Sequence, residues 1–86
     1  MPRISSFYGI VITMYYREHG VPHFHARYGE HKASISIDRV EVLGGSLPMQ
    51  ALRLIGQWTV LHRAELLENW NRVQRREALE SIEPLP

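Results

Sequence analysis

The chain has 86 residues, which is enough for one domain, and it contains no cysteine. A domain of this size without disulfides is typical of the reducing cytoplasm, and the first residues lack the basic and apolar layout of a signal peptide. No apolar run approaches the ~18 residues of a membrane span, and a net charge of +1 excludes a polycation that coats nucleic acid. We therefore expect one cytoplasmic domain over residues 1–86, in which only a local patch can meet nucleic acid.

The first half of the chain, residues 1–45, is rich in aromatic and β-branched residues, which favour strands. Residues 7–16 form the first expected strand. Residues 39–43 form a short further strand, which Gly44 and Gly45 are expected to end.

Between these segments, His23–Tyr28 and His31–Asp38 predict a hairpin around Gly29 and Glu30. Glycine at the first central position favours a type II′ turn, and this turn pairs Tyr28 with His31. In that register the apolar side chains of both strands fall on one face and the polar side chains on the other, which supports the pairing. The apolar face carries Phe24, Ala26, Tyr28, Ala33, Ile35 and Ile37, and the polar face carries His23, His25, Arg27, Lys32, Ser34 and Ser36.

The second half, residues 46–76, repeats apolar residues at three- and four-residue steps, which predicts helix. One helix over this stretch would be ~45 Å long, so we expect a break near Val60–Ala64. Ser46 is expected to cap the first helix, and two prolines leave residues 77–86 as an extended tail. The predicted fold is α+β, with an antiparallel sheet of three to four strands and two helices packed on one face.

Three histidines, His19, His23 and His25, stand in a His-x3-His-x-His pattern. A strand points alternate side chains to one face, so His23 and His25 can reach one metal ion while His19 approaches from a loop. Three histidines with one open position hold catalytic zinc, and imidazole also suits nickel. The pattern predicts a zinc or nickel site, to which Glu18 or Glu30 can add an oxygen. The alternative is that His23 and His25 are solvated polar residues.

The polar hairpin face also suits phosphate, and Arg27, Lys32 and Ser34 are the candidate nucleic-acid-binding residues. A histidine pair beside two cations fits a metal-free ribonuclease, in which His23 and His25 act as the catalytic base and acid. A solvated face is the plain alternative. A third interpretation is a non-catalytic protein-interaction domain whose helical half meets a partner or a second copy of the chain.

Short motifs along nearly the whole chain are similar to those of one family. They are Phe7-Tyr8-Gly9-Ile10, Met14-Tyr15, His19, Pro22-His23-Phe24-His25, Tyr28-Gly29, Gly45-Ser46-Leu47-Pro48, Trp58, Leu61-His62, Glu65-Leu66-Leu67, Trp70 and Ile82-Glu83-Pro84-Leu85. On these residues the chain resembles the bacterial domain-of-unknown-function family 4160. The family often has proline at the position of Val21, a departure that leaves the three histidines intact.

This resemblance implies a small two-gene module of toxin–antitoxin type, with a cognate small protein encoded nearby and with either autoregulation or RNA as the target. It assigns no catalytic residue. We therefore expect a protein that engages RNA or that cognate protein through the polar hairpin face. The alternatives are a histidine-rich zinc or nickel protein with hydrolytic activity and a non-catalytic interaction domain.

Overall fold

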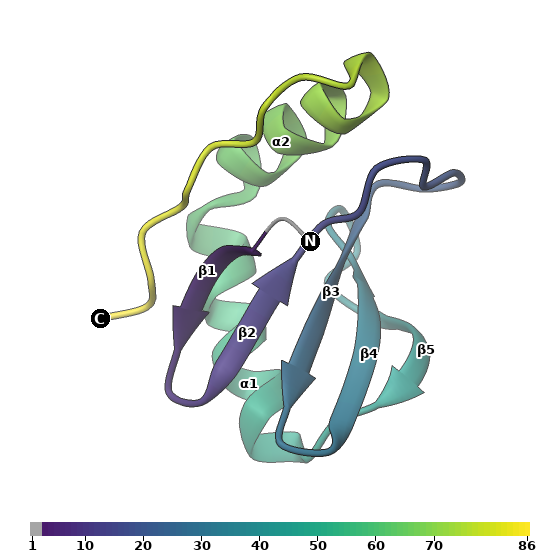
Figure 1. Ribbon diagram of the computed structural model, residues 1–86. Helices are drawn as coiled ribbons and strands as arrows, with labels where there is room; N and C mark the ends of the chain where they lie inside the picture. Colours follow the sequence, from purple (N-terminus) through teal and green to yellow (C-terminus); the bar gives the residue numbers. More distant parts are fainter. Residues whose placement is uncertain (1–2) are drawn as a thin grey trace.

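The computed structural model describes residues 3–86, which form an α+β fold of five strands followed by two helices (Figure 1). The sheet is one antiparallel meander whose strands lie side by side in chain order. The strands are β1 (Arg3–Phe7), β2 (Ile10–Thr13), β3 (His23–Tyr28), β4 (His31–Ser36) and β5 (Val42–Ser46), and the helices are α1 (Met49–Leu61) and α2 (Arg63–Arg75). The α+β class is as predicted, but the sheet has five strands rather than three to four.

The extra strand arises because residues 7–16 do not form one strand. Tyr8 and Gly9 have φ values of 49° and 80°, and two successive positive values are those of a type I′ turn between β1 and β2. Tyrosine rarely signals such a turn, so the sequence pattern concealed it. The Tyr8 hydroxyl donates to the carbonyl oxygen of Pro86 at 2.7 Å, which joins the turn to the end of the chain.

Strand β5 runs through the two glycines that were expected to end a strand. Gly45 has a φ of 79°, and a Cβ built there would overlap the carbonyl oxygen of Lys32 in β4. The glycine therefore lets β5 approach β4 closely instead of stopping it. Ser46 is the last residue of this strand, so the predicted cap is wrong, and Pro48 precedes α1 without a side-chain hydrogen bond.

The predicted hairpin of β3 and β4 is confirmed in its register, from Tyr28 opposite His31 to His23 opposite Ser36. Gly29 has a φ of 60° and Glu30 has no positive φ, as a type II′ turn requires. The alternation of the two faces follows from this register. The buried members of the apolar face are Phe24, Ala26, Ala33, Ile35 and Ile37.

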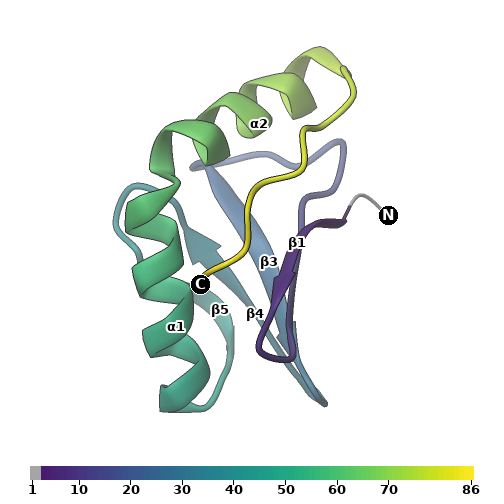
Figure 2. The same ribbon diagram turned by 90° about the vertical axis from the view of Figure 1, so that its left-hand side faces the viewer.

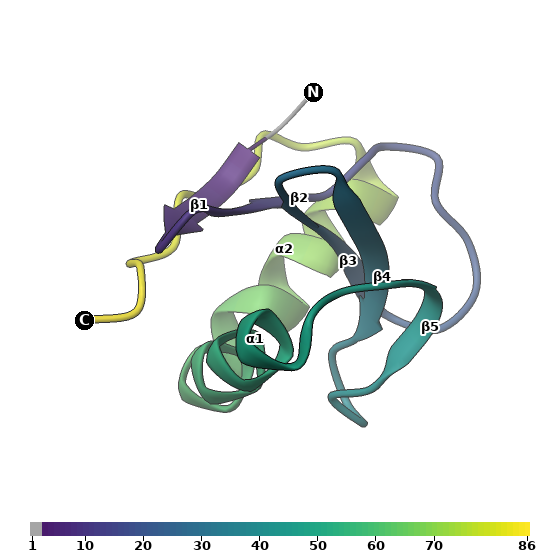
Figure 3. The ribbon, with the colours of Figure 1, turned by 90° about the horizontal axis from the view of Figure 1, so that it is seen from below.

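Helix α1 covers this apolar face of the sheet, as the two turned views show (Figures 2 and 3). Its Trp58 is fully buried, with ring centroids 5.2 Å from Phe7 and 5.7 Å from Phe24. The predicted break between the helices is confirmed at His62, and α2 leads away past the end of the sheet (Figure 2). Neither helix in residues 3–86 is long and apolar enough to cross a membrane.

The tail, residues 77–86, contains no helix or strand and returns along β1 (Figure 1). Buried Asn69 holds its start by exchanging two hydrogen bonds of 2.9 Å with the backbone of Glu80. Further on, the Ile82 N–H donates to the carbonyl oxygen of Ile4 at 2.8 Å. The tail therefore covers the β1 side of the molecule, and α1 and the tail leave the other face of the sheet open.

An exposed ion pair between Arg75 and Glu77 lies at the C-terminal end of α2. Arg75 donates to the carboxylate of Glu77 at 2.9 and 3.0 Å, and this hydrogen bond raises the pKa of Arg75 and lowers the pKa of Glu77. A lowered carboxyl pKa stabilises the fold above the pKa of the unfolded chain, and this contribution is lost as the pH falls through the folded value. Because both side chains are exposed, the acid stability of the fold depends little on this pair.

Alanine substitutions at the adjacent glycines test the close approach of β5 to β4. We expect Gly45→Ala to lower the free energy of unfolding by about 2 kcal/mol or more, because a positive φ and an overlap with β4 act together. The matched control is Gly44→Ala, whose Cβ meets Ser34 Oγ at an ordinary 3.6 Å, and we expect a change within about 1 kcal/mol. Urea unfolding followed by tryptophan fluorescence measures both, and equal losses would contradict this account of β5.

Candidate functional site

Three titratable side chains meet at one end of the open face of the sheet. Glu18 comes from the connection between β2 and β3, and His23 and His25 come from alternate positions of β3. One nitrogen or oxygen from each side chain lies within 4.8 Å of the other two, and residues 3–86 contain no second group of this kind. We call these three residues the Glu-His-His cluster.

His23 is held in one orientation by its neighbours. Its Nδ1 lies 2.8 Å from the carbonyl oxygen of Val21, and a carbonyl only accepts, so Nδ1 carries the proton. The lone pair of the neutral ring is therefore on Nε2, which lies 3.7 Å from Glu18 Oε1. The ring packs on Trp70 of α2 at a centroid distance of 5.0 Å and is 9% exposed. This histidine is thus a fixed, inward-facing group on what the sequence presented as a polar face.

His25 is more accessible and is paired directly with Glu18. Its Nε2 lies 2.5 Å from Glu18 Oε1, and the ring packs on Tyr15 in a T-shaped arrangement with a centroid distance of 4.6 Å. The side chains of His25 and Glu18 are 32% and 28% exposed, so solvent reaches this end of the cluster. The side-chain amide of Gln74 donates to the Glu18 carbonyl at 3.3 Å, so α2 also supports the connection that carries the carboxylate.

The chemistry of the cluster follows from its donor atoms. Two imidazole nitrogens and one carboxylate oxygen bind zinc well, and imidazole also suits nickel. In the arrangement described, the carboxylate accepts a hydrogen bond from His25 instead. Whether Glu18 binds a metal ion or accepts this hydrogen bond, its negative carboxylate lies beside the two histidines. The solvent-exposed side of His25 leaves room for a further ligand.

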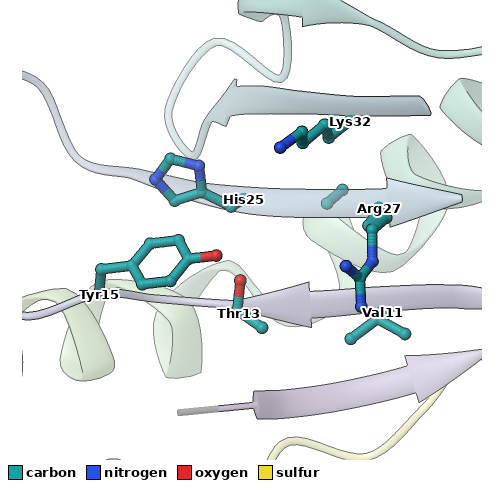
Figure 4. Close-up of a pocket in the computed structure, with 7 residues that line it drawn as sticks. Val11, Thr13, Tyr15, His25, Arg27 and Lys32 are labelled. Carbon is teal, nitrogen blue, oxygen red and sulfur yellow. The ribbon is translucent and has the colours of Figure 1, made fainter. Parts of the chain in front are cut away.

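A depression of about 270 Å³ adjoins the cluster on the open face (Figure 4). Lys32 and Arg27 stand opposite each other in the β3–β4 register, and Thr13 stands opposite His25 on β2. In Figure 4 the Lys32 amine points toward the His25 side, while the Arg27 guanidinium extends over Val11. The lining residues are Val11, Thr13, Tyr15, His25, Ala26, Arg27 and Lys32.

Comparison with known proteins adds a family but no activity. Residues 9–71 match the family described as Domain of unknown function (DUF4160). The chain belongs to this family. The matched range runs from the β1–β2 turn into α2, so it contains the whole Glu-His-His cluster together with Arg27 and Lys32. No curated protein and no solved structure matches the chain.

The structure of this DUF4160 chain brings together part of the predicted metal set. His23 and His25 belong to the cluster, whereas His19 is exposed on the connection and lies outside it. Glu18, which the sequence suggested as an added oxygen ligand, takes the third place. Among the predicted nucleic-acid-binding residues, Arg27 and Lys32 are exposed and Ser34 is half-buried.

Sequence reasoning missed the contribution of β2 and α2 to this site. Val11 and Thr13 line the depression because β2 pairs with β3, and Trp70 covers His23 from α2. The β2 residues carried a signal, since Val11 and Thr13 alternate with the buried Ile10 and Ile12. The position of Trp70 carried none, because its contact depends on the angle of α2 to the sheet.

The hydrogen bond from His23 Nδ1 predicts the tautomer of this ring. In a long-range ¹⁵N–¹H spectrum recorded where the ring is neutral, we expect a protonated Nδ1 and an unprotonated Nε2, because the Val21 carbonyl cannot donate. The exposed His31 is the control for an imidazole outside the cluster. A proton on Nε2 of His23 would contradict the described orientation, since no lone pair would then face Glu18.

Proposed function

We propose that this DUF4160 chain binds one divalent transition-metal ion, zinc or nickel, through Glu18, His23 and His25. The observation that carries the proposal is the convergence of three donor atoms within 4.8 Å of one another. Catalytic zinc sites use two histidines and one carboxylate in this way and keep a position for water. The exposure of His25 and Glu18 favours such an open site over a closed structural one.

The surroundings of His23 support metal binding. Metal-ligating histidines commonly donate their second ring N–H to a carbonyl or carboxylate, which fixes the tautomer, and the bond to Val21 has this form. Packing on Trp70 holds the ring with its Nε2 toward the cluster. The side chain of His23 therefore loses little conformational entropy when a metal ion binds.

The hydrogen bond between His25 and Glu18 is the one interaction that an ion must replace. Because the carboxylate accepts, the His25 Nε2 carries a proton, and this nitrogen must release it to become a ligand. Metal binding is therefore expected to release protons and to strengthen as the pH rises. An ion of charge +2 held by one carboxylate would also leave the site positively charged.

Paired substitutions at adjacent positions test which residues bind the ion. We expect Glu18→Gln to weaken zinc or nickel binding by at least about tenfold, because it removes the anionic ligand and keeps the shape. The neighbouring His19→Ala is the matched control, and we expect less than about a threefold change because His19 lies outside the cluster. Competition of tag-free protein with a chromophoric chelator measures the affinity.

The double variant His23→Ala/His25→Ala completes this experiment and should abolish binding, with circular dichroism as the control for folding. Loss of binding in His19→Ala but not in Glu18→Gln would restore the set of three histidines predicted from the sequence. Absence of metal binding by the folded wild-type protein would overturn the proposal.

A second candidate function needs no metal and is favoured by the 2.5 Å contact between His25 and Glu18. A carboxylate that accepts from an imidazole orients the ring and fixes its tautomer, so His25 suits general acid–base catalysis beside Arg27 and Lys32. His23 is less suited to the predicted two-histidine ribonuclease, because it is buried and its Nδ1 proton is bound to Val21.

Cleavage of an RNA oligonucleotide by protein freed of metal with a chelator separates the two candidates. Cleavage that persists without metal and is lost in His25→Ala would support the acid–base function. Cleavage that requires added zinc or nickel would support the metal centre instead.

The toxin–antitoxin role and the cognate small protein remain predictions from the family resemblance. Both candidate functions fit such a role, and neither depends on it. A complex with a cognate protein that survives His23→Ala/His25→Ala would favour the helical surface as the interaction site.

A further inference from the structure

The open face of the sheet carries a longer groove than the depression beside the cluster. A second depression of about 340 Å³ lies next to the first, and the two share His25 and Lys32. The second one continues over Ser34 to Gly44 and Gly45 of β5. We call the two depressions together the sheet groove. It crosses four strands, from β2 to β5, which at ~4.8 Å per strand spacing is about 14 Å.

The sheet groove carries two cationic side chains that form no ion pair with any of residues 3–86, and the carboxylate of Glu18 beside the groove pairs with His25 instead. Among the described residues 3–86, neither Arg27 nor Lys32 forms an ion pair, and no Asp or Glu lines either depression. On α2, by contrast, Arg72 and Arg75 are paired with glutamates. The groove therefore favours an anionic ligand although the whole chain has a net charge of only +1.

Hydroxyl groups and an aromatic ring add to this charge. Thr13 and Tyr15 line the first depression and Ser34 the second, and within the described part of the chain none of their hydroxyls forms a hydrogen bond. Such groups bind phosphate and sugar oxygens, and a tyrosine ring offers a stacking surface to a base. In Figure 4 the Tyr15 hydroxyl points along the groove toward Thr13.

The β5 end of the groove is open because it lacks side chains. A Cβ built on Gly44 approaches Ser34 Oγ, so this position faces the groove side of the sheet. All residues of β5 are exposed, so a ligand longer than one phosphate can pass over this strand. A shallow groove across a sheet fits a single-stranded nucleic acid, whose backbone it can follow and whose bases it can stack.

We infer that the sheet groove binds a single-stranded nucleic acid, with its phosphates at Arg27 and Lys32 and its chain crossing from β2 to β5. The inference deepens the proposed function and rests on it in one respect: the ion of the Glu-His-His cluster would lie beside the bound strand, because His25 belongs to both. The charge of that ion adds to the attraction for phosphate.

Fluorescence anisotropy of labelled uridine and thymidine decamers tests this inference. We expect Arg27→Gln/Lys32→Gln to weaken binding at least tenfold and to reduce the slope of log affinity against log salt by about 1.4, because each phosphate that is no longer neutralised accounts for about 0.7. The control Arg53→Gln/Arg76→Gln removes two exposed charges outside the groove, and we expect less than a twofold change.

A variant that changes no charge tests whether the bound nucleic acid passes over β5. Gly44 has no positive φ, and its Cβ would meet Ser34 Oγ at an ordinary 3.6 Å, so Gly44→Leu should fold and should block the groove over β5. We expect it to weaken decamer binding at least fivefold and to leave zinc affinity within twofold of wild type. This separates occupancy of the groove from the state of the metal centre.

The outcomes distinguish the two proposals. Zinc binding without decamer binding would overturn the inference and leave the metal centre standing. Decamer binding that needs Arg27 and Lys32 in protein that binds no metal would support the groove and overturn the proposed function. Equal affinity for a duplex of the same length would overturn the choice of a single-stranded nucleic acid. Equal competition by polyglutamate would also overturn it, in favour of an acidic protein partner. Preference between the uridine and thymidine decamers identifies RNA or DNA.

Discussion

The burial of Trp58 decides which face of the sheet is available for function. Its ring lies against Phe7 and Phe24, and its indole N–H donates to the carbonyl oxygen of Glu83 at 2.8 Å. A buried indole gives a large apolar contact and requires a partner for its N–H, and here the tail provides that partner. One side chain of α1 therefore holds both the helix and the tail on the apolar face of the sheet. The opposite face stays accessible at His25, Arg27 and Lys32, although Trp70 of α2 covers His23 at one end.

The site depends in turn on α2, which a single residue, His62, separates from α1. The break at His62 turns α2 toward the connection between β2 and β3 (Figure 2), where Trp70 packs on His23 and Gln74 holds the Glu18 backbone. Rigid elements thereby position both a histidine and a carboxylate that belongs to a loop. This arrangement reduces the conformational entropy that a bound ion or strand would have to overcome.

The parts of the fold that the sequence revealed are those with local physical causes. The β3–β4 hairpin follows from one glycine and a two-residue alternation, and the break between the helices follows from length. The Tyr8-Gly9 turn was hidden because a distant contact with Pro86 supports an unusual turn residue. Gly44 and Gly45 were misread because glycine ends some strands and permits close pairing in others. The pairing of Glu18 with His25 depends on the path of a loop that α2 supports, and no sequence period encodes that path.

The return of the tail to β1 also affects the order in which the chain can fold during synthesis. The strand pairings join neighbours in sequence, so the hairpins can form early, whereas the contact of Ile82 with Ile4 joins opposite ends of the chain. The indole N–H of Trp58 finds its acceptor only in Glu83, 25 residues further along the chain. A nascent chain emerging from the ribosome therefore exposes an incomplete core until the tail has also emerged. The contacts of the tail are thus expected to form last, after the hairpins and α1.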